Sequence, residues 1–365
     1  MMSNKQWNVG IIGLGGIGDY HMNNLAKIHN TNVVAICDVN AKAVEQVGER
    51  LNLPAEKRYT DYRAIIADPD IDFVISGVSN KFHCDILKVA IACGKPIFSE
   101  KPFTRTMEEA DDLIRLYEAN PIPCMIGFSY RYRPCFQYVK QLVTDGALGR
   151  IRHIAAHYLQ EENAPMFNKE YTWRFNKEMA GSGILADIGS HMVDAARFFV
   201  GEFTQVSGMM TTFTDRRLDK RTGEYAEVDV DDFTGFQCVL EGGVMGSFYT
   251  HKNAIGTGNQ FNVTLFGDLG TVRMSVEKPN EVHLTIRSGE NLQLTESVIH
   301  LDEKSMKPML QDFVDYLEQK NSSSLPTIID GYRNQQVLQA IIDSAQDGVT
   351  RSLSHHSNVK REELV

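Results

Sequence analysis

Over residues 1–127, short continuous apolar runs alternate with longer stretches in which apolar residues recur at helical spacing. The runs lie at 9–13, 33–37, 71–76, 95–99 and 124–128. Between the last two runs, apolar residues return every three or four positions, as on one helix face: Met107, Ala110, Leu113, Ile114 and Tyr117. Continuous apolar strands separated by helices predict a parallel sheet covered on both faces.

From about residue 128 the pattern changes to longer strands with period-two alternation. A strand is predicted around 151–159, and three more with alternating apolar residues at 261–265, 272–276 and 282–286. Helices are predicted at 134–144, 187–200, 309–319 and 332–347. Long strands grouped together with few helices predict a large, open, mostly antiparallel sheet with one covered face.

The first apolar run leads into a glycine triplet, Gly13-x-Gly15-x-x-Gly18. These glycines suit a tight turn, close approach to a pyrophosphate, and packing of the next helix on the sheet. Asp38 ends the second apolar run 20 residues after Gly18, where an acid contacts the ribose hydroxyls. A turn that binds nothing would explain the glycines but not Asp38. Its carboxylate repels a 2′-phosphate, so NAD is favoured over NADP, although Lys42 is close enough in sequence to help the phosphate.

At 365 residues, the chain exceeds the roughly 250–300 residues that a single core usually reaches, so we predict two domains. The predicted divisions are a doubly wound Rossmann domain at 1–127, a second α/β domain at 128–350, and a polar, frayed tail at 351–365. The helix at 332–347 is expected to pack back toward the first domain.

Charge, hydropathy and cysteine spacing exclude several classes of protein. The net charge of −10 disfavours a nucleic-acid partner, and no run approaches the roughly 20 apolar residues of a membrane span. The N-terminus shows no apolar region of a signal peptide. Six cysteines without C-x-x-C spacing indicate buried thiols in a reducing compartment. We therefore expect a cytoplasmic protein.

Two segments carry residues suited to proton chemistry. Lys101 follows the strand at 95–99, and a lysine at the carboxyl end of a parallel strand would face the nicotinamide end of the cofactor. The alternative interpretation is that Lys101 is an ordinary surface lysine. We also expect a cis peptide bond before Pro102. On the predicted helix at 187–200, Asp187, His191 and Asp194 share one face.

His191 on that helix is a candidate general acid/base. A core histidine is one alternative. A metal site is less favoured, because Asp187 and His191 supply only two ligands.

Aromatic residues beside guanidinium groups provide candidate substrate contacts. Trp173 and Arg174 could form a wall against a hydroxylated ring, by stacking on C–H faces and donating to hydroxyls. The segment Arg131-Tyr132-Arg133 is interpreted in the same way. Packing at a rim is the competing interpretation of both segments.

Together, several motifs resemble the Gfo/Idh/MocA family of oxidoreductases. The resemblance runs from about residue 9 to 348 and rests on Gly13-x-Gly15-x-x-Gly18, Asn80-x-x-His83, Glu100-Lys101-Pro102, Gly127-Phe128-Ser129-Tyr130-Arg131-Tyr132, Gly181-x-Gly183-x-x-x-Asp187-x-Gly189-x-His191-x-x-Asp194 and Ile329-Asp330-Gly331. The sequence departs from the usual pattern at Ser182, where many relatives have glycine, and at Ser129, where asparagine is common. Neither departure removes a catalytic group.

The resemblance implies a catalytic set of Lys101, Asp187 and His191. In that scheme His191 takes the hydroxyl proton, Lys101 stabilises the alkoxide, and Asp187 positions the substrate and favours the charged forms of the other two. It also implies cofactor contacts from Gly13, Gly15, Ile17, Gly18, Asp38, Ser79, Asn80, His83, Glu100 and Lys101. Similarity to members acting on cyclic sugars adds substrate contacts from Tyr132, Gln160, Trp173 and Arg174.

The sequence thus predicts an NAD-dependent dehydrogenase that oxidises a secondary hydroxyl of an inositol, pyranose or anhydrosugar. The resemblance also implies that the α/β domain at 128–350 serves substrate binding and oligomerisation. The open sheet of this domain commonly forms the oligomer interface in the family, so a homotetramer is expected, with a dimer next. One alternative is a nucleotide-sensing regulator without catalysis, which the presence of Lys101, Asp187 and His191 disfavours. Another is a relative that holds NAD tightly and uses it transiently.

Overall fold

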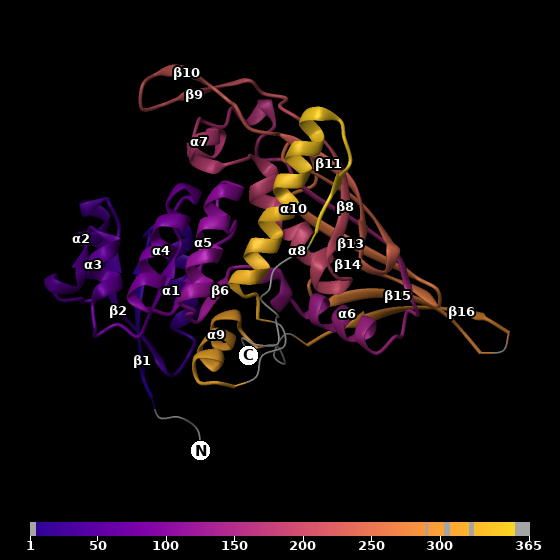
Figure 1. Cartoon of the computed structure of the whole chain (residues 1–365), viewed down its shortest axis with the longest axis horizontal. Helices are drawn as coiled ribbons and strands as arrows, with labels where there is room; N and C mark the ends of the chain where they lie inside the picture. The colour runs from indigo at the N-terminus through magenta and orange to yellow at the C-terminus, as the bar shows by residue number, and fades with distance from the viewer. Residues whose placement is uncertain (1–4, 290, 303–306, 321–324, 355–365) are drawn as a thin grey trace. The chain divides into compact units, whose positions relative to one another are not determined.

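The computed structural model describes residues 5–289, 291–302, 307–320 and 325–354, which form two compact units (Figure 1). The first unit contains residues 5–127 and the described part of 308–332. The second contains the described part of 128–307 together with 333–354. Helix α10 (Ile328–Asp347) begins in the first unit and continues in the second.

The first unit is built on a parallel sheet in the order β3-β2-β1-β4-β5-β6. Its strands are β1 (Trp7–Ile12), β2 (Thr31–Cys37), β3 (Arg58–Tyr59), β4 (Phe73–Ser76), β5 (Ile97–Ser99) and β6 (Cys124–Ile126). The predicted Rossmann sheet is confirmed. The strand order reverses between β1 and β4, and ligands bind at the carboxyl ends of strands at such a point.

Helices cover both faces of this sheet. They are α1 (Gly16–Leu25), α2 (Ala41–Arg50), α3 (Tyr62–Ala67), α4 (His83–Cys93), α5 (Met107–Ala119) and α9 (Met309–Leu317). On one face, Phe98 of β5 contacts His21 of α1 and Phe313 of α9, with ring centroids 5.0 and 6.3 Å apart. On the other, Ile65 of α3 packs against Gly10 and α3 adjoins α4, which adjoins α5.

The second unit contains a large open sheet in the order β16-β15-β14-β13-β7-β12-β11-β8-β17. Every neighbouring pair is antiparallel except β12 and β7. The predicted mostly antiparallel sheet is therefore confirmed. Its strands are β7 (Ile151–Gln160), β8 (Phe203–Thr211), β11 (Phe233–Leu240), β12 (Val244–His251), β13 (Asn259–Gly267), β14 (Gly270–Ser275), β15 (Glu281–Ser288), β16 (Gln293–His300) and β17 (Arg351–Ser352).

Four strands of this sheet, β7, β13, β14 and β15, were located from the sequence, whereas β8, β11, β12 and β16 were not. Two further segments also differ from the expectations. Residues 351–352 were expected in a frayed tail but pair with β8, and the expected tail at 355–365 lies outside the described residues. A separate hairpin of β9 (Arg216–Asp219) and β10 (Glu224–Glu227) was not predicted, because its polar residues show no period-two alternation.

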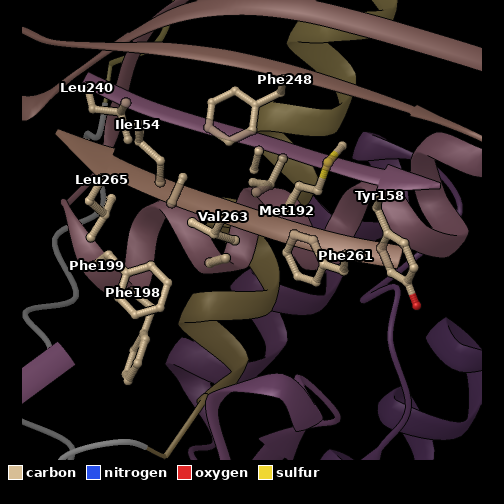
Figure 2. Packing of buried hydrophobic residues seen from close by; sticks show 14 of the residues in the cluster. Ile154, Tyr158, Met192, Phe198, Phe199, Leu240, Phe248, Phe261, Val263 and Leu265 are labelled. Carbon is tan, nitrogen blue, oxygen red and sulfur yellow. The ribbon is translucent and has the colours of Figure 1, made fainter. Parts of the chain in front are cut away.

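One face of the large sheet carries the main core of the second unit. Helices α6 (Pro134–Thr144), α8 (Ser190–Phe199) and the second-unit part of α10 contribute to the same cluster as the strands. Figure 2 shows side chains of this cluster from β7, β12 and β13 together with those of α8. Along β12 burial alternates, so that Phe248 is buried whereas Tyr249 is exposed. One covered face was predicted, and the structure has it.

Five cysteines are buried, as predicted, but Cys93 is exposed because it ends α4 just before Gly94. Among the described helices, none combines the length and the apolar character needed to cross a membrane.

Candidate active site

The glycine turn of the first unit has open space at two of its glycines and none at two others. A Cβ atom on Gly18 would lie 2.1 Å from the carbonyl oxygen of Gly13, and Gly13 itself has φ 90°. By contrast, a Cβ on Gly15 or Gly16 would meet nothing within 4 Å. Gly15 precedes α1, whose N-terminus has no side-chain cap, so its amides are available to an anion. Ile17, in the first turn of α1, is exposed.

Asp38 follows β2 and is oriented by two backbone amides. Its Oδ2 accepts a hydrogen bond from the amide of Leu14 at 2.8 Å, and its Oδ1 accepts one from Asn40 at 2.9 Å. The side chain of Asn40 in turn accepts from the amides of Lys42 and Ala43 and caps α2. These amides already have an acceptor, which makes the start of α2 a poor site for a 2′-phosphate. The arrangement fits NAD.

The segment after β4 connects to the segment after β5 through a buried histidine. The Nδ1 and Nε2 atoms of His83 lie 2.7 and 3.2 Å from the carbonyl oxygens of Pro102 and Val78. Burial lowers the pKa of His83 below its usual value, despite these two carbonyls. Ser79 precedes the 3-10 turn Asn80–Phe82, in which Asn80 is buried. His83 thus fixes the backbone beside Lys101.

Glu100 and Lys101 directly follow β5, at the carboxyl edge of the sheet. Glu100 lies 2.9 Å from Nε2 of His21 and accepts from the amide of Lys101 at 3.2 Å. Burial would raise the pKa of Glu100, but the hydrogen bond and charge of His21 and the charge of Lys101 outweigh it, so the pKa is lowered. The Lys101–Pro102 bond is cis, as expected, and Lys101 is half-buried.

In the second unit, Asp187 and His191 lie one turn apart where a π-helical turn (Leu185–Gly189) runs into α8. A buried acid that the sequence did not reveal, Asp231, holds the start of this segment. Its carboxylate accepts from the amides of Gly183 at 2.6 Å and Leu185 at 2.9 Å. A Cβ on Gly183 would lie 2.2 Å from the Asp231 carbonyl oxygen, which explains why glycine is needed there.

His191 is 8% exposed and lies beside two phenol rings. Its ring centroid lies 4.4 Å from that of Tyr130 and 6.4 Å from that of Tyr158. The two hydroxyl oxygens are 2.5 Å apart, and Tyr158 donates to Oδ1 of Asn259 at 2.9 Å. Burial and the neighbouring Tyr130 raise the pKa of Tyr158, so its phenol stays neutral.

The carboxylate of Asp187 contacts a buried lysine. Lys252, the residue after β12, donates through Nζ to Oδ2 of Asp187 and to Oε1 of Glu162, the latter at 2.9 Å. Sequence analysis missed Lys252, because no spacing links it to a segment 65 residues away.

Asp194, which was predicted to share a helix face with His191, pairs with a buried arginine. Arg131 donates to it from Nε at 3.0 Å and from Nη2 at 2.6 Å. Arg131 is 1% exposed, so the hypothesis that it forms part of an open substrate wall is wrong. A buried guanidinium paired with a buried carboxylate anchors α8 instead.

Residues predicted to contact the substrate occupy three other places in the second unit. Gln160 ends β7; its Nε2 donates to Asn259 at 2.5 Å, whereas its buried Oε1 has no hydrogen-bond partner within the described ranges. Tyr132 ends the 3-10 turn Ser129–Tyr132 and is half-buried. The guanidinium of Arg174 lies over the ring of Trp173, 4.5 Å from its centroid.

A small satellite core supports the turn Trp173–Phe175. Phe175 packs with Val228 and Val230, and the guanidinium of Arg217 lies 4.5 Å from its ring centroid. Arg217, from β9, is 4% exposed and also donates to the carbonyl of Asn163 at 2.7 Å. The hairpin that was not predicted therefore helps to fix the segment that carries Trp173.

The part of the chain that the structure describes contains no group of three or more His, Cys, Asp or Glu residues arranged to hold a metal ion. Lys101 belongs to the first unit, whereas Asp187 and His191 belong to the second.

Comparison with known protein families gives two matches that together span most of the chain. Residues 7–128 match the model of an oxidoreductase family with an NAD-binding Rossmann fold. Residues 136–273 match the model of the GFO/IDH/MocA C-terminal domain.

Individual relatives include sugar and polyol dehydrogenases. Levoglucosan dehydrogenase from Pseudarthrobacter phenanthrenivorans is 32% identical over 78% of this chain and 77% of its own length. Myo-inositol 2-dehydrogenase from Thermotoga maritima is 25% identical over 77% of this chain and 79% of its own length. A solved structure of levoglucosan dehydrogenase in complex with NADH and L-sorbose matches with a TM-score of 0.88 and 28% identity, covering 96% of this chain and 99% of that one.

Proposed function

Since the chain belongs to the Gfo/Idh/MocA family of NAD-dependent oxidoreductases, we propose that it oxidises a secondary hydroxyl of a cyclic sugar or polyol. The observation that carries the proposal is the buried His191, one turn from Asp187 on a segment whose start Asp231 fixes. A histidine held in this way is suited to accept and return a proton.

The first unit supplies the cofactor site in this proposal. The open space at Gly15, the uncapped start of α1 and the oriented carboxylate of Asp38 fit a dinucleotide. Bound NAD supplies the hydride-accepting chemistry. The remaining proposed contacts come from Gly13, Ile17, Gly18, Ser79, Asn80, His83, Glu100 and Lys101.

Three side chains divide the proton chemistry. His191 accepts the proton of the substrate hydroxyl, and its neutral form is the one that does so. Lys101 donates a hydrogen bond to the same oxygen and stabilises the negative charge that develops there. Asp187 orients the substrate hydroxyl and influences the charge state of His191.

We propose that the substrate is a ring with several hydroxyl groups, such as a pyranose, an anhydrosugar or an inositol. Trp173 offers an aromatic face and Arg174 a donor. The unpartnered Oε1 of Gln160 provides an acceptor for a hydroxyl, and Tyr132 is a further contact. The names of the sugar and inositol dehydrogenases among the relatives support this class.

Oligomeric state and compartment are also proposals. The uncovered face of the large sheet exposes Met209, Met245 and Tyr249, which supports association of copies through this face, as a homotetramer or a dimer. Five buried thiols without C-x-x-C spacing support a reducing compartment such as the cytoplasm.

Two variants test the catalytic roles separately from cofactor binding. Lys101→Ala and His191→Asn should each reduce turnover by roughly 10²-fold or more. NAD affinity, followed by nucleotide titration, should change little. Full activity of either variant would refute its catalytic role, whereas loss of NAD binding would show that the residue is needed mainly to hold the cofactor.

A further inference from the structure

We propose that Lys252 is a positioning residue for Asp187, and that through this carboxylate it tunes the acid–base behaviour of His191. The inference rests on the proposed function in that it takes Asp187 and His191 to be catalytic. Lys252 itself is not proposed to touch the substrate.

The environment of Lys252 is unusual for a lysine. The residue is 6% exposed, and lysine is rarely buried unless it is paired. It directly follows β12, and its carbonyl oxygen accepts from the amide of Asn163 at 2.9 Å, so its backbone is fixed as well. Its ammonium group donates to both Asp187 and Glu162.

The ammonium remains charged in this position. Burial favours the neutral amine, but the negative charges of Asp187 and Glu162 and the hydrogen bonds to them outweigh burial and raise the pKa of Lys252. Glu162 is shared with a second lysine, Lys169, at 3.0 Å. The charges therefore alternate along the row Asp187, Lys252, Glu162 and Lys169. Of the two lysines, Lys252 is the one that contacts Asp187.

This row matters because Asp187 lies one turn from His191. An uncompensated carboxylate near an imidazole favours the imidazolium form, which cannot accept a proton from a hydroxyl. Lys252 neutralises much of that field and fixes the carboxylate through Oδ2. In the part of the chain that the structure describes, the titratable groups near this pair include the phenols of Tyr130 and Tyr158, of which Tyr158 also interacts electrostatically with Asp187. Glu162 and Lys169 lie beyond Lys252.

The test compares Lys252→Met with Lys252→Arg, which keeps the charge. Two measurements report the protonation of His191. One is the pH profile of kcat/KM for NAD-dependent sugar oxidation. The other is the NMR titration of the His191 imidazole, whose signal is assigned by its absence in His191→Gln. For Lys252→Met, the acid limb of the profile and the midpoint of the titration should both move to higher pH. At pH 7, kcat/KM should fall about tenfold or more. Lys252→Arg should restore the midpoint and the acid limb toward wild type.

Lys169→Met is the matched control, because it removes an ammonium that pairs with Glu162 and not with Asp187. It should leave the His191 midpoint in place. If Lys252→Met unfolds, the double variant Lys252→Met/Asp187→Asn removes both charges. Its His191 midpoint should match that of Asp187→Asn alone, because Lys252 acts through Asp187.

An unchanged His191 midpoint in folded Lys252→Met would overturn the proposal and leave Lys252 as a structural ion pair. The proposal would also be overturned if Lys252→Met shifted the His191 midpoint by the same amount in the Asp187→Asn variant as in the wild-type protein. The NMR readout does not need turnover, so a shifted midpoint in a protein that oxidises no sugar would refute the proposed function and still support the link from Lys252 to His191.

Discussion

The backbone amide of Leu14 donates a hydrogen bond to Oδ2 of Asp38 across 2.8 Å. The glycine turn after β1 therefore orients the acid at the end of β2, although 24 residues separate the two in sequence. In the proposed cofactor site, the same piece of backbone would therefore serve both pyrophosphate binding and ribose recognition. A change at Asp38 should consequently alter nucleotide preference without altering the sheet.

Replacing Asp38 by alanine should weaken NAD binding and narrow its advantage over NADP. Loss of a charged hydrogen bond to a ribose corresponds to about 1.5–3 kcal/mol, or tenfold or more in affinity. NADP should lose less, because the repulsion of its 2′-phosphate also disappears. Nucleotide titrations measure both affinities, with Asp112→Ala, an exposed acid on α5, as the control. An unchanged NAD:NADP ratio would show that Asp38 does not contact the ribose.

The glycines of the turn should respond differently to the same methyl group. Gly18→Ala should destabilise the first unit, because its Cβ would lie 2.1 Å from a carbonyl oxygen. Gly15→Ala should leave thermal stability near wild type but reduce NAD affinity at least tenfold, because the methyl occupies space that the pyrophosphate needs. Gly16→Ala, equally open, is the matched control and should preserve NAD affinity. Equal NAD affinity in the Gly15 and Gly16 variants would contradict this assignment.

Glu202 should make the stability of the second unit depend on pH in the acidic range. Burial would raise the pKa of Glu202, but the hydrogen bonds and charges of Arg197 and Arg333 outweigh it and lower the pKa to about 2, from 4.5. A lowered folded-state pKa contributes stability that is fully present above pH 4.5 and is lost as the pH falls toward 2. The contribution is on the order of 3 kcal/mol.

Urea unfolding of wild type and Glu202→Gln between pH 7 and pH 3 tests this dependence. The difference in free energy of unfolding should be largest at pH 7 and should shrink below pH 4.5. Glu296→Gln, an exposed acid on β16, serves as the control. A difference that stays constant with pH would mean that Glu202 stabilises the protein by packing and not by charge.

Arg217 should affect sugar binding without touching the sugar. Arg217→Met keeps much of the side-chain volume but loses the hydrogen bond to Asn163 and the cation–π contact with Phe175. The turn that carries Trp173 then loses support, so KM for the sugar should rise by about tenfold, equivalent to roughly 1.4 kcal/mol. NAD affinity should be unchanged. Arg216→Met, its exposed neighbour on β9, is the control, and an unaltered KM in Arg217→Met would refute the supporting role.

The sequence was most informative where a pattern is local. Continuous apolar runs predicted the parallel strands, because strands buried on both faces carry few polar residues. The glycine triplet could be identified because the backbone geometry of the turn after β1 restricts which residues fit there. Asp38 could be identified by its distance in sequence from that triplet. The predicted helix at 134–144 coincides with α6, because proline is favoured at the first position of a helix and Pro134 marks that position.

Long-range pairings were not predictable in the same way. The Lys252–Asp187 contact and the Asp231 cap join residues 65 and 46 positions apart, and a single sequence carries no signal for such contacts. Asp194 shares a predicted helix face with His191, yet burial pairs it with Arg131. Helical periodicity identifies a face, but only packing decides which charged residues on that face become structural.

The most direct test of the account is NADH formation by the wild-type protein with NAD, and in parallel NADPH formation with NADP, over a panel of pyranoses, anhydrosugars and inositols. The account predicts turnover on one class of ring with NAD and much less with NADP. No turnover across the panel, in a protein that still binds NAD, would contradict it and favour a nucleotide-sensing regulator or a protein that retains its NAD.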